Sequence, residues 1–125
     1  SVSKQFTATC IMLLYEQNKL DYDDTITKYL TNLPYDNITI RHLLNHTSGL
    51  PDYEDIVEEY WEGDTENDFF TTKDLLESYS EEELELDFEP EEKYEYSNTG
   101  YVFLACIVEK ASGMSFEDFI KKYVF

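Results

Sequence analysis

Residues 1–17 read SVSKQFTATCIMLLYEQ, and this stretch decides how the rest of the chain is interpreted. Its apolar side chains recur at the spacing of one helix face: Val2, Phe6, Cys10, Leu13 and Leu14. The pattern predicts a helix over residues 2–17. Ser1 and Lys4 are three residues apart, so a helix places the lysine amine one turn from the serine hydroxyl. A serine hydroxyl is a poor nucleophile until an adjacent base takes its proton.

A second segment, Tyr96-Ser97-Asn98, brings a phenol and a carboxamide one residue apart. These groups can move a proton and hydrogen-bond a substrate amide. Asn98 is also well placed to cap the helix that we expect to follow. The same pattern occurs in residues 35–37, but Pro34 precedes it, and we interpret that copy as a turn. Ser1, Lys4, Tyr96 and Asn98 are therefore the candidate catalytic residues.

Three stretches in one order resemble the serine β-lactamase and penicillin-binding protein superfamily, in its class C and DD-peptidase-like branch. Residues 1–8 (SVSKQFTA) resemble its nucleophile helix, residues 39–53 (TIRHLLNHTSGLPDY) its helix and turn beside the site, and residues 88–101 (FEPEEKYEYSNTGY) its second catalytic motif. The resemblance implies a serine hydrolase that works through an acyl-enzyme. It would act on β-lactams, D-alanyl peptides or esters, so the implied partner is a small molecule or a peptidoglycan-type peptide.

The resemblance also implies a role for each candidate residue. Ser1 is the expected nucleophile, Lys4 accepts its proton, and Tyr96 passes a proton to the leaving group. Asn98 hydrogen-bonds the substrate amide and holds Lys4. His46 is expected to support the turn beside the site. We expect no cofactor and no metal, because His42 and His46 are four apart but no glutamate follows the first of them.

The chain departs from the family pattern in two ways. Glu91 follows Pro90 where the family usually has glycine. In addition, the third motif, a Lys or His, any residue, then Gly on a sheet strand, is not found in these 125 residues. That strand supplies one of the two oxyanion donors, and losing one donor typically costs about two to three orders of magnitude in rate. We therefore expect this chain alone to be inactive and, without the sheet, to expose Leu13, Leu14, Phe103 and Ile107.

The expected fold class is mainly α, the helical portion of the α+β serine β-lactamase and transpeptidase-like fold. Residues 1–125 would form one helical subdomain of a larger β-lactamase-related domain whose β-sheet part is missing here. Beyond the first helix, start and stop signals predict a short helix or turn over residues 24–30 and helices over 41–46, 72–79 and 99–111. Thr39 would cap the helix over 41–46. A last helix would follow Ser115, with Asp118 three residues later as in a capping box. Cys10 and Cys106 lie in apolar helical patterns and are expected to be buried and free.

The formal net charge is −19, and residues 54–95 hold 19 of the 28 acidic residues with only two lysines. Such a surface repels phosphate backbones, so we expect no nucleic-acid partner. No apolar run approaches the length of a transmembrane segment. The family resemblance suggests export to the periplasm or cell envelope; the sequence itself leaves the compartment open.

Three other functions stay open at this point. The protein could be a non-hydrolytic penicillin-binding or sensor module, which holds an acyl group without turnover. It could be a partial chain that folds as a helical unit and catalyses nothing. It could also be an N-terminal-nucleophile hydrolase that uses the α-amino group of Ser1 as base. We disfavour the last, because it gives Lys4 and Tyr96 no role.

Overall fold

The computed structural model describes residues 2–51, 76, 79–80 and 85–124. Its elements are α1 (Val2–Glu16), the 3₁₀ turn η1 (Ile26–Lys28), α2 (Ile40–Leu44), α5 (Asn98–Ser112) and α6 (Phe116–Tyr123). The described residues form no β-strand, only an isolated antiparallel bridge between Thr25 and Thr39. The mainly helical prediction is therefore confirmed. The predicted helix over 72–79 lies largely outside the described residues.

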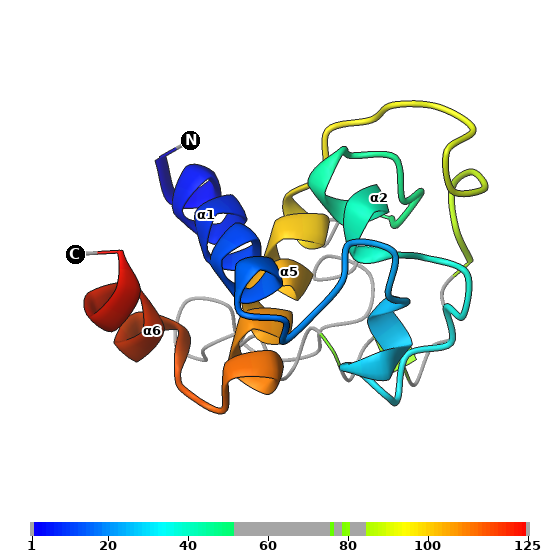
Figure 1. Ribbon diagram of the computed structural model, residues 1–125. Helices are drawn as coiled ribbons and strands as arrows, with labels where there is room; N and C mark the ends of the chain where they lie inside the picture. The colour runs from blue at the N-terminus through cyan, green and yellow to red at the C-terminus, as the bar shows by residue number, and fades with distance from the viewer. Residues whose placement is uncertain (1, 52–75, 77–78, 81–84, 125) are drawn as a thin grey trace, which may run out of the picture.

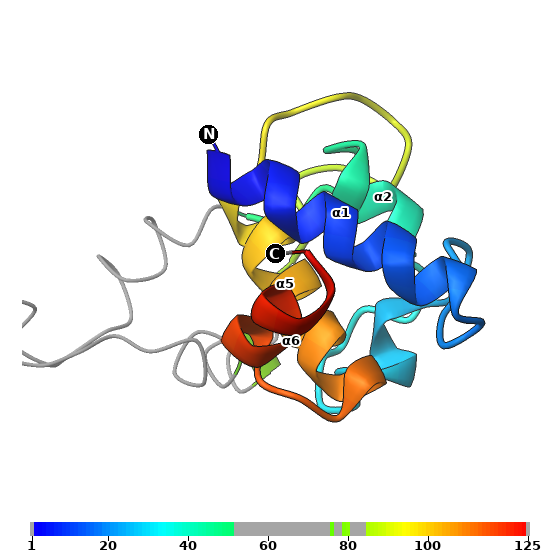
Figure 2. The ribbon, with the colours of Figure 1, turned by 60° about the vertical axis from the view of Figure 1, so that its left-hand side comes forward.

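Helix α5 is the centre of the arrangement, since α1, α2 and α6 all pack against it. Figure 1 shows α1 lying across α5, with α2 on one side and α6 on the other. The turned view in Figure 2 shows α1, α5 and α6 stacked together. This packing brings the start of α1 close to the start of α5, although the two lie far apart in the sequence.

The core runs through every element. Its largest fully buried side chains include Tyr79, Phe103, Phe119, Ile11, Leu14, Leu43 and Ile107. Burying an aliphatic or aromatic side chain of this size contributes about 1.5–3 kcal/mol. The expectation that Leu14, Phe103 and Ile107 are exposed is therefore wrong, and Leu13 is partly buried against the same core. The helices cover one another here, so these side chains are buried without a flanking sheet.

The buried face of α1 differs from the predicted stripe. Thr7, Cys10, Ile11 and Leu14 are the buried residues, whereas Phe6 and Leu13 are half-buried. Ile11 was missed because the apolar run 10–14 fits two adjacent helix faces, and only docking on α5 selects one. Cys10 and Cys106 are buried and free, as predicted. Burial raises the pKa of both thiols, that of Cys106 to about 12, so neither is a reactive thiolate.

The helix ends follow local signals. After α1, Asn18 adopts a left-handed conformation (φ 60°) while the Lys19 N–H donates to the Leu14 carbonyl and the Asn18 N–H to that of Tyr15. These two bonds form a Schellman motif, which satisfies carbonyls at the end of the helix. Gly113 ends α5 with the simpler αL motif: its φ is 73° and its N–H donates to the Glu109 carbonyl. The Ser115 hydroxyl caps α6 by accepting from the Asp118 N–H. The predicted boundaries are therefore right to within one or two residues.

Candidate active site

Lys4 and Tyr96 meet at the surface where α1 packs against the segment that enters α5. Lys4 Nζ lies 4.8 Å from the centroid of the Tyr96 ring. Tyr96 is 51% exposed, and a cation over an aromatic ring at such a site contributes roughly 0.5–1 kcal/mol. Ser1, the predicted nucleophile, lies outside the described residues. Two of the four predicted site residues, from distant parts of the sequence, are thus in contact.

The fourth predicted residue, Asn98, is the first residue of α5 and is half-buried. The predicted capping role for Asn98 is wrong. The cap is Ser97, which has an extended backbone (φ −133°) and whose hydroxyl accepts the Gly100 N–H at 3.0 Å. Asn98 cannot cap the helix because it is already inside the first turn. The Asn98 carboxamide, two residues after Tyr96, therefore does not cap the helix.

His46 contacts the second motif at both sides of Tyr96. The His46 carbonyl accepts the Glu95 N–H at 2.9 Å, and His46 Nδ1 accepts the Ser97 N–H at 3.0 Å. Its ring stacks on Tyr96 with the centroids 4.7 Å apart. Burial first, and the Lys4 ammonium second, lower the pKa of His46. These contacts show how His46 supports residues 95–97, and the sequence alone did not predict them.

His42 supports the neighbouring loop. Its Nδ1 accepts the Thr39 N–H at 3.0 Å while the Thr39 hydroxyl accepts the His42 N–H, a capping box at the start of α2. Its Nε2 lies 3.4 Å from Oε1 of Glu91. Glu91, at the family's glycine position, has φ 71° and donates its N–H to the Thr47 carbonyl at 2.8 Å. The departure from the family pattern therefore puts a side chain where the backbone requires a left-handed conformation.

The turn after α2 holds this region together at Gly49. Gly49 has φ +81°, and a Cβ there would lie 2.0 Å from the Phe88 carbonyl oxygen. The Gly49 carbonyl accepts the Asp87 N–H at 2.8 Å, so the two backbones are in direct contact. A small pocket of about 70 Å³ lies between this turn and the second motif, lined by Ser48, Gly49, Leu50, Asp87, Phe88, Glu95, Tyr96 and Ser97. It adjoins the Tyr96 side of the site.

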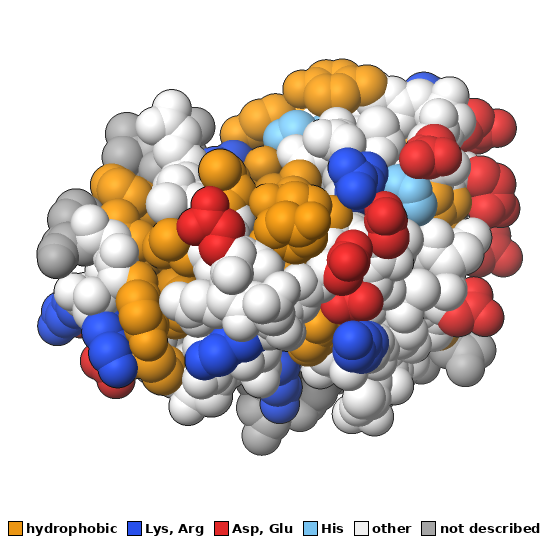
Figure 3. Space-filling view, viewed as in Figure 1, with side chains coloured by type: hydrophobic (Ala, Val, Ile, Leu, Met, Phe, Trp, Pro, Cys, Tyr) orange, Lys and Arg blue, Asp and Glu red, His pale blue; other side chains and the backbone are white. Residues whose placement is uncertain are grey.

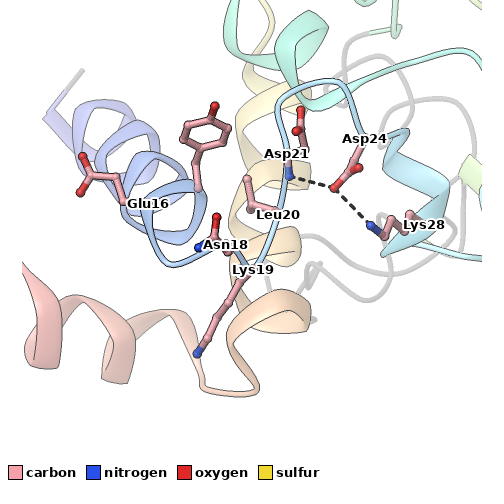
Figure 4. Close-up of a pocket in the computed structure, with 8 residues that line it drawn as sticks. Glu16, Asn18, Lys19, Leu20, Asp21, Asp24 and Lys28 are labelled. Carbon is pink, nitrogen blue, oxygen red and sulfur yellow. Dashed lines mark hydrogen bonds and ion pairs between the residues drawn. The ribbon is translucent and has the colours of Figure 1, made fainter.

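A larger hollow of about 460 Å³ lies at the other end of α1 and contains none of the predicted site residues. Figure 4 shows its charged side chains and the bonds from the Asp21 N–H and Lys28 to Asp24. Burial alone would raise the pKa of Asp24, but these bonds and one from the Tyr29 hydroxyl lower it. The charged carboxylate thus already has its partners within residues 21–29, and we assign this hollow a structural role.

Acidic side chains gather along one edge of the face in Figure 3. In the described part of the acidic stretch, these side chains are exposed: Glu85, Asp87, Glu89, Glu91, Glu92 and Glu95.

Of the helices described, none is both long and apolar enough to cross a membrane. Within the described ranges, no group of three or more His, Cys, Asp or Glu side chains is arranged to hold a metal ion.

Comparison with known proteins confirms the resemblance. The family model described as Beta-lactamase matches residues 1–125, so the chain belongs to the beta-lactamase family. Penicillin-binding protein 4* of Bacillus subtilis (strain 168) is 49% identical over 125 residues, which are all of this chain and 27% of that protein. The chain thus spans about a quarter of the length of this relative.

Solved structures agree on the fold. The crystal structure of a penicillin binding protein from Bacillus halodurans superposes with a TM-score of 0.79 at 35% identity, covering 95% of this chain and 35% of that one. The D-amino acid amidase from Ochrobactrum anthropi SV3, complexed with L-phenylalanine, superposes with a TM-score of 0.78 at 31% identity, covering 98% and 34%. The chain therefore corresponds to one part of the fold of these larger proteins.

Proposed function

We propose that the intact protein is a serine hydrolase in which residues 1–125 supply the nucleophile and the proton-transfer groups. The observation that carries the proposal is the contact between Lys4 and Tyr96. Family membership supplies the context: relatives in this family include penicillin-binding proteins and a D-amino acid amidase. The substrate would be a β-lactam, a D-alanyl peptide or an ester.

In the first half of the proposed reaction, Ser1 Oγ attacks the substrate carbonyl and its proton passes to Lys4, which must first release the proton of its resting ammonium form. The carbonyl becomes a tetrahedral oxyanion. The bond to the leaving group then breaks, and the leaving group takes a proton by way of Tyr96. In the second half, water attacks the Ser1 ester, releases the acid and returns the proton to serine. Asn98 would hydrogen-bond the substrate amide and hold Lys4 during both halves.

Two serines near Tyr96 whose side chains the structure describes, Ser48 and Ser97, are poorly placed as nucleophiles, which supports Ser1. The Ser97 hydroxyl is buried and accepts the Gly100 N–H as a helix cap. Ser48 is 1% exposed, and its hydroxyl accepts the Leu50 N–H. Neither can approach a substrate carbonyl without breaking local structure.

We further propose that a flanking sheet of the same protein completes the oxyanion hole, because a developing oxyanion requires two aimed donors. The 125-residue segment alone would then be inactive. A peptidoglycan-type substrate lies outside the cytoplasmic membrane, which would place the intact protein in the periplasm or cell envelope.

Turnover by the intact protein tests this function. A chromogenic cephalosporin, an acyl-D-alanyl-D-alanine peptide and an activated ester are assayed with Lys4→Ala and Tyr96→Phe. Each change should lower kcat by about 100-fold or more on the accepted substrate, the usual scale for a lost acid or base. Lys19→Ala and Tyr15→Phe, which change exposed residues at the far end of α1, are the matched controls. Equal rates for Tyr96→Phe and Tyr15→Phe would refute the proton-transfer role.

A further inference from the structure

The backbone on both sides of Tyr96 is bound to one residue, His46. The Glu95 N–H donates to the His46 carbonyl and the Ser97 N–H to His46 Nδ1, at 2.9 and 3.0 Å. The residue between them, Tyr96, stacks its ring on the imidazole with an interplanar angle of 21°. His46 thus determines both the path of the chain at Tyr96 and the plane of its ring.

His46 is itself held in place by its neighbours. Its backbone has φ 59°, a left-handed conformation that Asn and His adopt more readily than most residues. The imidazole also stacks on Tyr101, with the ring centroids 5.1 Å apart, and the Tyr101 hydroxyl donates to the Leu44 carbonyl at 3.0 Å. Burial raises the pKa of Tyr101, so this hydroxyl keeps its proton and the bond persists at neutral pH. The imidazole is therefore in contact with two aromatic rings, Tyr96 before α5 and Tyr101 within it.

We propose that His46 is a positioning residue that orients Tyr96 toward Lys4 and that it does so only while its imidazole is neutral. This inference rests on the proposed function, in which Tyr96 transfers a proton. It adds a pH-dependent step that does not involve the reacting atoms, since His46 acts through Tyr96 rather than on the substrate.

The chemistry of the imidazole gives the reason. Nδ1 accepts the Ser97 N–H, so the neutral ring carries its proton on Nε2. Protonation would place a second N–H at Nδ1, facing the Ser97 donor, and this bond would be lost. One of the two backbone bonds beside Tyr96 would then be lost, while the bond to the His46 carbonyl would stay.

The groups around the ring favour the neutral form. Among the described residues, these titratable groups face it from the elements packed against it: Lys4 from α1, Tyr94 and Tyr96 from the segment before α5, and Tyr101 from α5. Glu95 contributes its N–H to His46, while its side chain lines the neighbouring pocket. Burial and then Lys4 lower the pKa of His46, so the orienting contacts are complete near pH 7 and weaken in acid.

The test is the pH dependence of acylation of the intact protein by a chromogenic cephalosporin between about pH 4.5 and 8. His46→Asn is the informative variant: its amide oxygen can accept the Ser97 N–H, asparagine tolerates positive φ, and the side chain does not titrate. His42→Gln is the matched control, since glutamine can replace the ring in the capping box and His42 does not touch Tyr96. His46→Ala removes the acceptor altogether.

Protonation of Lys4 by itself slows acylation in acid, so every variant that keeps Lys4 should lose rate there. The wild type and His42→Gln should lose rate more steeply than His46→Asn, whose rate at pH 7.5 should stay within about tenfold of the wild type. His46→Ala should be slower by about tenfold or more at every pH. If His46→Ala does not fold, His46→Asn still decides the question. An acid limb in His46→Asn that superposes on the wild type overturns the inference alone. Failure of the wild type to be acylated overturns the proposed function and the inference with it.

Discussion

Lys4 and Tyr96 lie far apart in the sequence, and the Lys4 ammonium lies 4.8 Å from the centre of the Tyr96 ring. The packing of α1 against α5 produces this contact, because Lys4 is in the first turn of α1 and Tyr96 immediately precedes the cap of α5. The core between the two helices, with Cys10, Ile11 and Leu104 fully buried, fixes their separation. The geometry of the candidate site is thus a consequence of core packing rather than of the surface residues themselves.

Replacing Lys4 by methionine should raise the pKa of His46. The ammonium lowers this pKa after burial, so removing the charge leaves only the burial contribution, and the pKa should stay below its ordinary value of about 6.5. NMR titration of the imidazole protons measures the change. Lys19→Met, at the other end of α1, should leave the titration where it is in the wild type. An unchanged His46 pKa in Lys4→Met would show that the two groups are not coupled.

Gly49→Ala should destabilise the protein by about 3 kcal/mol or more, as measured by urea unfolding. The new Cβ would have to lie 2.0 Å from the Phe88 carbonyl oxygen, at a φ of +81°. Gly113→Ala is the matched control: φ is 73°, but nothing lies within 4 Å of the added carbon. It should cost only about 1 kcal/mol. Equal losses in the two variants would mean that backbone strain, not the contact with Phe88, dominates at Gly49.

Glu91→Gly should stabilise the protein by about 0.5–1 kcal/mol. Glycine relieves the left-handed strain at φ 71°, while the lost contact with His42 involves a largely exposed carboxylate and contributes little. Glu91→Gln separates the two effects, because it keeps the strain and removes the charge. Its unfolding free energy should stay within about 0.5 kcal/mol of the wild type. A Glu91→Gly variant less stable than Glu91→Gln would contradict this account.

Local signals predicted the helices well. Thr39 and Ser115 act as caps and Gly113 as a stop because the bonds involved join residues only a few positions apart. The prediction of Asn98 as the cap of α5 was wrong for a physical reason: serine and asparagine have nearly equal capping preference, and only the backbone conformation identifies Ser97 as the cap. The capping box at α2 was missed because its third position carries histidine instead of the usual Glu or Gln.

The candidate site was less accessible to sequence reasoning. The pattern gave Lys4 and Tyr96 as separate candidates, and the family resemblance gave them roles, but their contact depends on how α1 docks on α5. The bond between His46 and Ser97 crosses 51 residues of sequence, and no local pattern specifies which ring nitrogen accepts it. The left-handed conformation of Glu91 was not predicted, because glutamate seldom adopts it. The glycine that the family usually has at this position was the available signal.

The most direct test of the central claim is the site of acylation. The intact protein is incubated with a fluorescent penicillin, and the adduct is located by peptide mass spectrometry. We expect a single adduct on the peptide that contains Ser1, abolished in Ser1→Ala and slowed in Lys4→Ala. An adduct on Ser48, Ser97 or any other residue, or labelling that persists in Ser1→Ala, would contradict it.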